Sequence, residues 1–156
     1  MASRRNRVVP TDRDYARLLE MRTALRRFLH WSEEQASLVG LTAMQHQLLL
    51  AVRGHVGRHG PTMGEVADAL LLRHHSAVGL VDRAVDAGLV ARVTDPSDQR
   101  VVRVRLTALG ARRIRQLSRV HLEELRRMAP AIATLARDLQ SGTSVRGPYD
   151  ANSSVV

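Results

Sequence analysis

Cysteine is absent from this 156-residue sequence, and so is lysine. Without thiols the chain can form no disulfide, no thiolate zinc site and no thiol redox switch. No apolar run approaches the roughly 20 residues of a membrane span. The basic start, MASRRNRVVP, lacks the apolar stretch of a signal peptide. We therefore expect a soluble, cytoplasmic protein with no membrane partner.

Aromatic residues are also scarce, at 3% of the chain. The core must then be built mainly from leucine, valine and alanine, which favours helices over a β-sandwich. The net charge of +9 comes entirely from arginine on the basic side. Such a balance predicts a polyanionic partner, either nucleic acid or an anionic membrane surface, and only the basic N-terminus favours the membrane. A GC-rich coding sequence is the plainer explanation for the missing lysine.

Apolar residues recur at helical spacing in the first part of the chain. They predict a helix over about residues 11–38, beginning at a Thr11 cap. A second helix is expected over residues 43–54, after a Thr42 cap. This second helix is apolar nearly all round, which predicts a place at the centre of the domain.

The next segment has the pattern of a helix-turn-helix. Thr62-Met63-Gly64-Glu65 matches a capping box, and the short helix that follows should end near Leu71. A turn, Leu72-Arg73-His74, leads into a further helix that Gly88 closes. Its inward stripe has i, i+3, i+4, i+7 spacing and consists of Ala77, Leu80, Val81 and Ala84.

A β-hairpin and further helices complete the predicted architecture. Leu89–Thr94 and Val101–Leu106 are expected as its strands, because DPSDQR between them is rich in turn residues. Thr107 then caps a long helix that Pro130 should interrupt, and a last helix, 132–139, should follow. The predicted fold is mainly α with a small β-hairpin, a winged helix-turn-helix with N- and C-terminal dimerisation helices.

The predicted organisation is a single domain over residues 11–140. Its dimerisation helices cover about 11–38 and 108–140, and the winged helix-turn-helix covers about 42–107. A flexible basic N-terminus, 1–10, and a disordered tail, 141–156, flank the domain.

The segment LVDRAVDAGLVARVTDPSDQRVVRVRLTALG, residues 80–110, resembles the MarR family of bacterial transcriptional regulators. DAGLV, DPSDQR and LTALG stand at that family's spacing, and the resemblance extends over about Tyr15–Leu139. It implies a homodimer that presents two recognition helices to successive major grooves of double-stranded DNA. The operator would be near-palindromic, with half-sites about 10 bp apart or a multiple of that. The implied function is a sequence-specific repressor released by a small aromatic or anionic ligand.

The side chains predicted to contact DNA lie at the start and outer face of the recognition helix and on the wing. Recognition helices enter the groove by their first turn. By resemblance, Arg100 lies in or along the minor groove, and Asp98 holds its guanidinium; Asp98 as a simple turn former is the alternative. An exposed turn without contact is the alternative for the two histidines. The set is Arg73, His74, His75, Ser76, Arg83, Asp98, Arg100 and Arg103.

Two residues are candidates for the ligand pocket, Trp31 and His46. Packing in an interface or core is the alternative for each. No metal or cofactor is predicted: glycines break the helix around His55 and His59, and the adjacent His74 and His75 do not share a helix face.

No enzyme motif is present in the sequence. It contains no Gly-rich phosphate loop, no paired catalytic carboxylates and no nucleophile elbow. The sequence therefore predicts a protein without enzymatic activity. The alternative to a specific regulator is a non-specific architectural DNA-binding protein, which the positive charge alone would serve.

Overall fold

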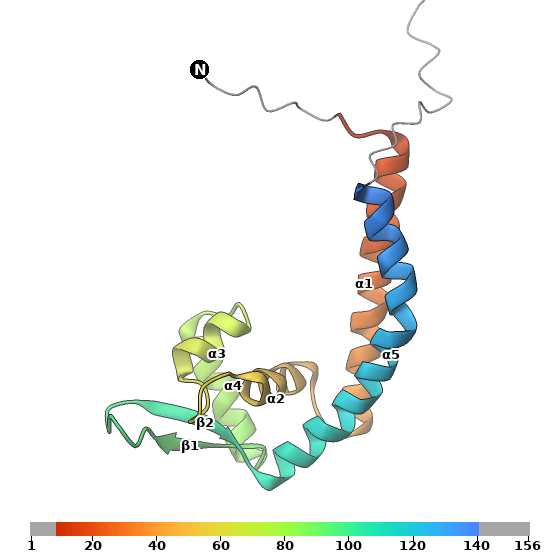
Figure 1. The fold of residues 1–156 in the computed structure, drawn as a ribbon. Helices are drawn as coiled ribbons and strands as arrows, with labels where there is room; N and C mark the ends of the chain where they lie inside the picture. The colour runs from red at the N-terminus through yellow and green to blue at the C-terminus, as the bar shows by residue number, and fades with distance from the viewer. Residues whose placement is uncertain (1–8, 141–156) are drawn as a thin grey trace, which may run out of the picture. The chain divides into compact units, whose positions relative to one another are not determined.

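The computed structural model describes residues 9–140 of the chain (Figure 1). Most of the predicted flexible N-terminus and the whole predicted disordered tail lie outside these residues. The elements in chain order are α1 (Asp12–Leu38), α2 (Ala43–Gly54), α3 (Met63–Ala69), α4 (His74–Asp86), β1 (Val90–Thr94), β2 (Val102–Leu106) and α5 (Ala108–Gln140). The prediction of a mainly helical fold with one small hairpin is confirmed. No helix among the described residues is long and apolar enough to cross a membrane.

The described chain divides into two compact units. One comprises the described parts of Met1–His30 and Leu125–Val156, which are the first turns of α1 and the last turns of α5. The other, Trp31–Glu124, holds the helix-turn-helix and the hairpin. All the residues predicted to contact DNA lie in this second unit.

Two capping boxes start helices α2 and α3 of this unit. The Thr42 hydroxyl accepts from the Gln45 amide at 3.2 Å, and the Gln45 side chain accepts from the Thr42 amide at 2.9 Å. Thr62 and Glu65 make the same pair of bonds at 3.3 and 2.7 Å. Each box satisfies two amides that a helix start leaves without partners. Both predicted caps are confirmed.

The core of the second unit is aliphatic. Its largest fully buried side chains come from six different elements, and they are Leu48, Leu49, Ile114, Leu117, Val66, Val81, Val90 and Val104. α2 contributes Leu48, Leu49 and Val52, whereas Leu50 of the same helix is half exposed. The predicted stripe of α4 is buried as a whole. Figure 1 shows α2 and α4 next to the hairpin that they cover.

The turn between α3 and α4 differs slightly from the prediction. α3 ends at Ala69, and Leu71 takes a left-handed φ of 53° while the Leu72 amide donates back to the Ala67 carbonyl at 2.9 Å. The sequence predicts His74 in the turn. In the structure His74 is the first residue of α4, because Arg73 adopts the extended conformation of an N-cap. α4 thus begins one residue earlier than the sequence suggests.

The wing is an antiparallel pair with Val90 opposite Leu106 and Thr94 opposite Val102. The loop before α3 lies along the second strand of the wing. The Val104 amide donates to the Pro61 carbonyl at 2.8 Å, and Thr62 forms an isolated antiparallel β-bridge with Arg103. This loop therefore fixes the wing to the start of α3.

The prediction that Pro130 divides the last part of the chain into two helices is wrong. α5 runs without a break from Ala108 to Gln140 and contains Pro130. Proline removes one backbone donor and crowds the preceding turn. The residues on both sides are mainly alanine, arginine and methionine, which favour helix strongly and keep it continuous. The predicted last helix is the C-terminal part of α5.

Candidate nucleic-acid interface

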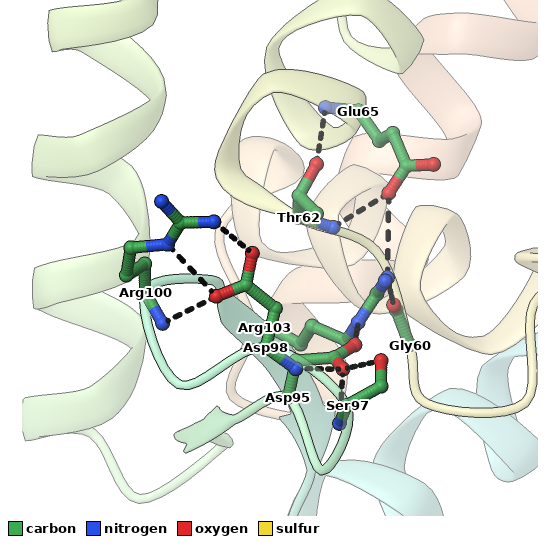
Figure 2. A network of polar contacts seen from close by, with 8 residues as sticks. All are labelled: Gly60, Thr62, Glu65, Asp95, Ser97, Asp98, Arg100 and Arg103. Carbon is green, nitrogen blue, oxygen red and sulfur yellow. Dashed lines mark hydrogen bonds and ion pairs between the residues drawn. The ribbon is translucent and has the colours of Figure 1, made fainter.

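A buried carboxylate organises the tip of the wing. The Asp95 side chain is only 3% exposed, and it accepts from the Ser97 amide at 2.8 Å, the Asp98 amide at 3.2 Å and the Arg103 Nε (Figure 2). The Ser97 hydroxyl also donates to it. These bonds, with the Ser97 hydroxyl first and Arg103 second, hold the pKa of Asp95 far below its ordinary value. The carboxylate therefore stays ionised, and its support of the turn persists, well below pH 4.

The contact predicted between Asp98 and Arg100 is present in the structure. Arg100 donates from Nε to Oδ1 and from Nη2 to Oδ2 of Asp98, both at 3.1 Å. Its backbone amide also donates to Asp98 Oδ1, at 3.0 Å, so the turn-forming alternative is present as well. The Arg100 side chain is 90% exposed. An ion pair this exposed adds little stability, so its main effect is to fix the direction of the guanidinium.

The pKa values of the pair follow from this bidentate contact. The Arg100 side chain is the first cause of a lowered Asp98 pKa, and the Asp98 side chain raises the pKa of Arg100. Both groups keep their charges throughout the physiological range. The wing tip thus presents a permanently charged, oriented guanidinium to the solvent.

Arg103 lies in a different environment from Arg100. Its side chain is 23% exposed and contacts the Asp95 carboxylate, the Gly60 carbonyl at 2.9 Å and Glu65 at 3.8 Å (Figure 2). It therefore connects the wing tip to the loop before α3 and to the α3 capping box. Asp95 and Glu65 were not singled out as partners from the sequence. The alternating pattern of the strand showed only that Arg103 shares a face with Arg105.

The start of α4, the predicted recognition helix, is open to solvent. Arg73, His74 and His75 are exposed, and Ser76 is partly buried. Arg73 occupies the N-cap position without making a side-chain cap bond, which leaves the polar helix start accessible. The predicted cluster at the helix start is thus brought together, whereas its contact with DNA stays a prediction.

Arg83 projects from the same helix one turn after Gly79. A Cβ at Gly79 would lie 3.5 Å from Arg83 Nη1, so the guanidinium extends over the glycine. The neighbouring Asp82 binds Arg92 of β1 at 2.5 Å, which joins the outer face of α4 to the wing.

The two candidate ligand residues both contact a third ring, His121 of α5. The ring centroids of Trp31 and His46 lie 4.9 and 4.7 Å from that of His121. His121 Nδ1 bonds to the Leu117 carbonyl at 2.9 Å and its Nε2 to the Ser32 hydroxyl at 2.7 Å. His121 is not among the site residues predicted from the sequence. The structure brings Trp31 and His46 into one cluster, and their ligand role stays a prediction.

Burial makes His46 sensitive to acid. His46 is 7% exposed, and burial, followed by the nearby His121, lowers its pKa from 6.5 to about 4. Because the folded state resists protonation, the stabilising effect is complete above pH 6.5 and is lost as the pH falls toward 4.

We predict that the wild type loses about 2 kcal/mol more unfolding free energy than His46→Gln between pH 7 and pH 4.5. Urea denaturation of both proteins at the two pH values measures this difference. Parallel losses in the two proteins would show that His46 titrates normally.

The described residues contain no group of three or more histidine, cysteine or acidic side chains able to hold a metal ion. His55 and His59 lie in the irregular loop after α2 and not on one helix face. Their i, i+4 spacing in the sequence therefore does not place the two imidazoles on one face of a helix.

Comparison with known proteins identifies similar sequences and folds. The profile of the MarR family matches residues 39–101. A curated Bacillus subtilis protein described as an uncharacterized HTH-type transcriptional regulator, YsmB, is 39% identical over 67 residues, which is 43% of this chain and 46% of that protein. The chain thus aligns with about half the length of this curated relative.

Solved structures extend the likeness over most of the chain. Wild-type MarR from E. coli is 26% identical with a TM-score of 0.61, covering 86% of this chain and 97% of that one. AbsC of Streptomyces coelicolor is 21% identical with a TM-score of 0.65, over 86% and 99% of the two chains. A mutant of S. aureus MepR bound to an oligodeoxyribonucleotide is 18% identical with a TM-score of 0.62, over 81% and 96%. The last two show the shared fold.

Proposed function

We propose that this chain, whose residues 39–101 belong to the MarR family, is a dimeric, sequence-specific DNA-binding transcription regulator of the cytoplasm. We further propose that it acts as a repressor and is released by a small ligand. The observation that carries the DNA-binding part is the wing tip. There, Asp98 orients a 90% exposed arginine within the same compact unit as the open helix start at Arg73–Ser76.

The proposal gives the charged residues different tasks. The exposed start of α4 enters a major groove, where Arg73, His74, His75, Ser76 and Arg83 are positioned to reach bases or phosphates. Arg100 inserts in or along the minor groove. The guanidinium of Arg103 is already bound by two carboxylates and a carbonyl, so we assign it to holding the wing in place.

Dimerisation is supported by apolar side chains left exposed on the unit that holds the first turns of α1 and the last turns of α5. Both α1 and α5 carry them there, and they are Tyr15, Leu18, Leu19, Leu25, Leu29, Leu125 and Ile132. A contiguous apolar helix face of this kind requires a covering surface, which a second copy supplies. Sedimentation equilibrium should therefore give about twice the chain mass of 17.3 kDa; a mass of one chain at micromolar concentration would contradict the dimer.

DNA binding is tested by fluorescence anisotropy on the intergenic DNA upstream of the protein's own gene, with random duplex as the competitor and at stated salt. A specific regulator should prefer its operator by about 10³-fold or more. A much smaller ratio would favour the architectural alternative, which needs only the positive charge. The absence of any preference would refute the specific regulator.

The ligand part of the proposal rests on the ring cluster of Trp31, His46 and His121. A ligand acts by favouring dimers whose recognition helices no longer match the groove spacing. A thermal-shift screen of aromatic acids, phenols, antibiotics and metal ions, followed by operator-release measurements, tests it. If no ligand changes the DNA affinity, this part of the proposal fails while DNA binding stands.

A further inference from the structure

A basic pocket lies at the base of the wing. The C-terminal end of α2, the loop after it, β2 and the start of α5 enclose a volume of about 310 Å³. Its ionisable lining residues are Arg53, His55, Arg58 and Arg105, and no acidic residue lines it. Three arginines from three separate segments of the chain thus line one cavity.

These three arginines have no carboxylate partner among residues 9–140. Other arginines of the wing do have one: Arg92 pairs with Asp82, and Arg100 pairs with Asp98. Glu65 accepts from Thr62, lies 3.8 Å from Arg103 and also attracts the lining residue His55. The three arginines of the pocket are left without a paired carboxylate among residues 9–140, and their mutual repulsion favours an anion between them.

Glycines shape the loop side of the pocket. Gly60 has a φ of +82°, and a Cβ there would lie 2.3 Å from the Val104 carbonyl oxygen. A Cβ at Gly57 would lie 2.4 Å from His55 Nε2, so the imidazole folds closely over this glycine. The loop can follow β2 this closely only because position 60 lacks a side chain. The cavity is consequently built into the local fold.

We infer that this pocket binds a small polyanion, a molecule that carries two or more phosphate or carboxylate groups. Guanidinium forks bind both kinds of group with charge-assisted, bidentate hydrogen bonds. The concave shape and the convergence of cations from several segments favour a compact ligand over a DNA strand. Occupancy is connected to the wing, because the Gly60 carbonyl on the pocket wall accepts from Arg103 Nη1 (Figure 2).

Isothermal titration of the full chain with pyrophosphate, and separately with citrate, at constant ionic strength tests the site. At least one of the two should bind saturably, and Arg58→Gln or Arg105→Gln should each lower its affinity about tenfold or more. Arg115→Gln makes the same charge change at an exposed position on α5 outside the pocket and should leave the affinity unchanged. Melting temperatures of all three variants verify folding.

Several results would overturn the inference. They are an absence of binding by both anions, equal affinity in the wild type and both pocket variants, or an equal loss in Arg115→Gln, which would indicate diffuse binding to an arginine-rich surface.

A second experiment distinguishes binding of free anions from binding of DNA phosphates. Without added polyanion, the pocket variants should keep the wild-type salt dependence of DNA binding. A slope reduced by about 1 for each substituted arginine would assign the pocket to the DNA backbone. If the chain binds no DNA, the titration alone decides.

Discussion

Arg100→Ala is expected to lower the DNA affinity of the proposed dimer about ten- to hundredfold on nearly all sequences, because each subunit would lose one positioned contact. The plot of log affinity against log salt should become shallower by about 2, one unit for each subunit. The side chain is 90% exposed, and the rest of the tip is held by Asp95, so the fold should be unaffected. Anisotropy titrations at several salt concentrations measure both effects.

A double-mutant cycle with Asp98→Ala tests whether the carboxylate positions the guanidinium or forms only the turn. If Asp98 acts through Arg100, its removal should weaken DNA binding in the wild type and change little in the Arg100→Ala background. An equal loss in both backgrounds would assign it to the turn, through its bond to the Arg100 amide. Arg100→Lys serves as the control that keeps the charge but cannot form the same fork. Unchanged DNA affinity and salt slope in Arg100→Ala would remove the wing tip from the interface.

The parts of the fold predicted correctly are those that depend on local chemistry. Thr42 and Thr62 each find their capping partner three residues later. The buried stripe of α4 repeats at helical spacing within one segment. The effect of Pro130 was predicted wrongly because it depends on the neighbouring residues as well as on the proline. The proline removes one backbone hydrogen bond, whereas the helix propensity of the residues around it favours a continuous helix.

The candidate site shows the same division between local and distant contacts. Asp98 and Arg100 are two residues apart, so their contact could be expected from the turn itself. The bond of Arg103 to the Gly60 carbonyl joins residues 43 positions apart, and Ser32 and His121 are separated by 89. No periodicity relates such distant residues. Their meeting is decided by how the loop before α3 lies along the wing and how α1 meets α5 within one unit.

Gly110→Ala is expected to destabilise the protein by about 3 kcal/mol and to lower its melting temperature by about 10 °C. A Cβ at position 110 would lie 2.0 Å from the Leu89 carbonyl oxygen and 3.0 Å from its carbon. Both are backbone atoms, so no side-chain rotation can relieve the overlap.

The cap of α5 leaves the backbone little freedom to move aside. The Thr107 amide donates to the Leu89 carbonyl at 3.1 Å, and the Thr107 hydroxyl accepts from the Gly110 amide at 3.0 Å. Moving either segment away therefore costs the bonds that join the end of α4 to the start of α5. Circular dichroism melts of the wild type and the variant measure the loss.

Gly54→Ala is the matched control for this substitution, because a Cβ at the end of α2 would meet no atom within 4 Å. Alanine favours helix over glycine, so this variant should be as stable as the wild type or more stable by up to about 1 kcal/mol. A Gly110→Ala protein that melts together with Gly54→Ala would contradict the close approach of α5 to Leu89. A selective loss would show that the LTALG segment contains glycine at position 110 for packing, since the wing strands and α5 can meet there only when that position has no side chain.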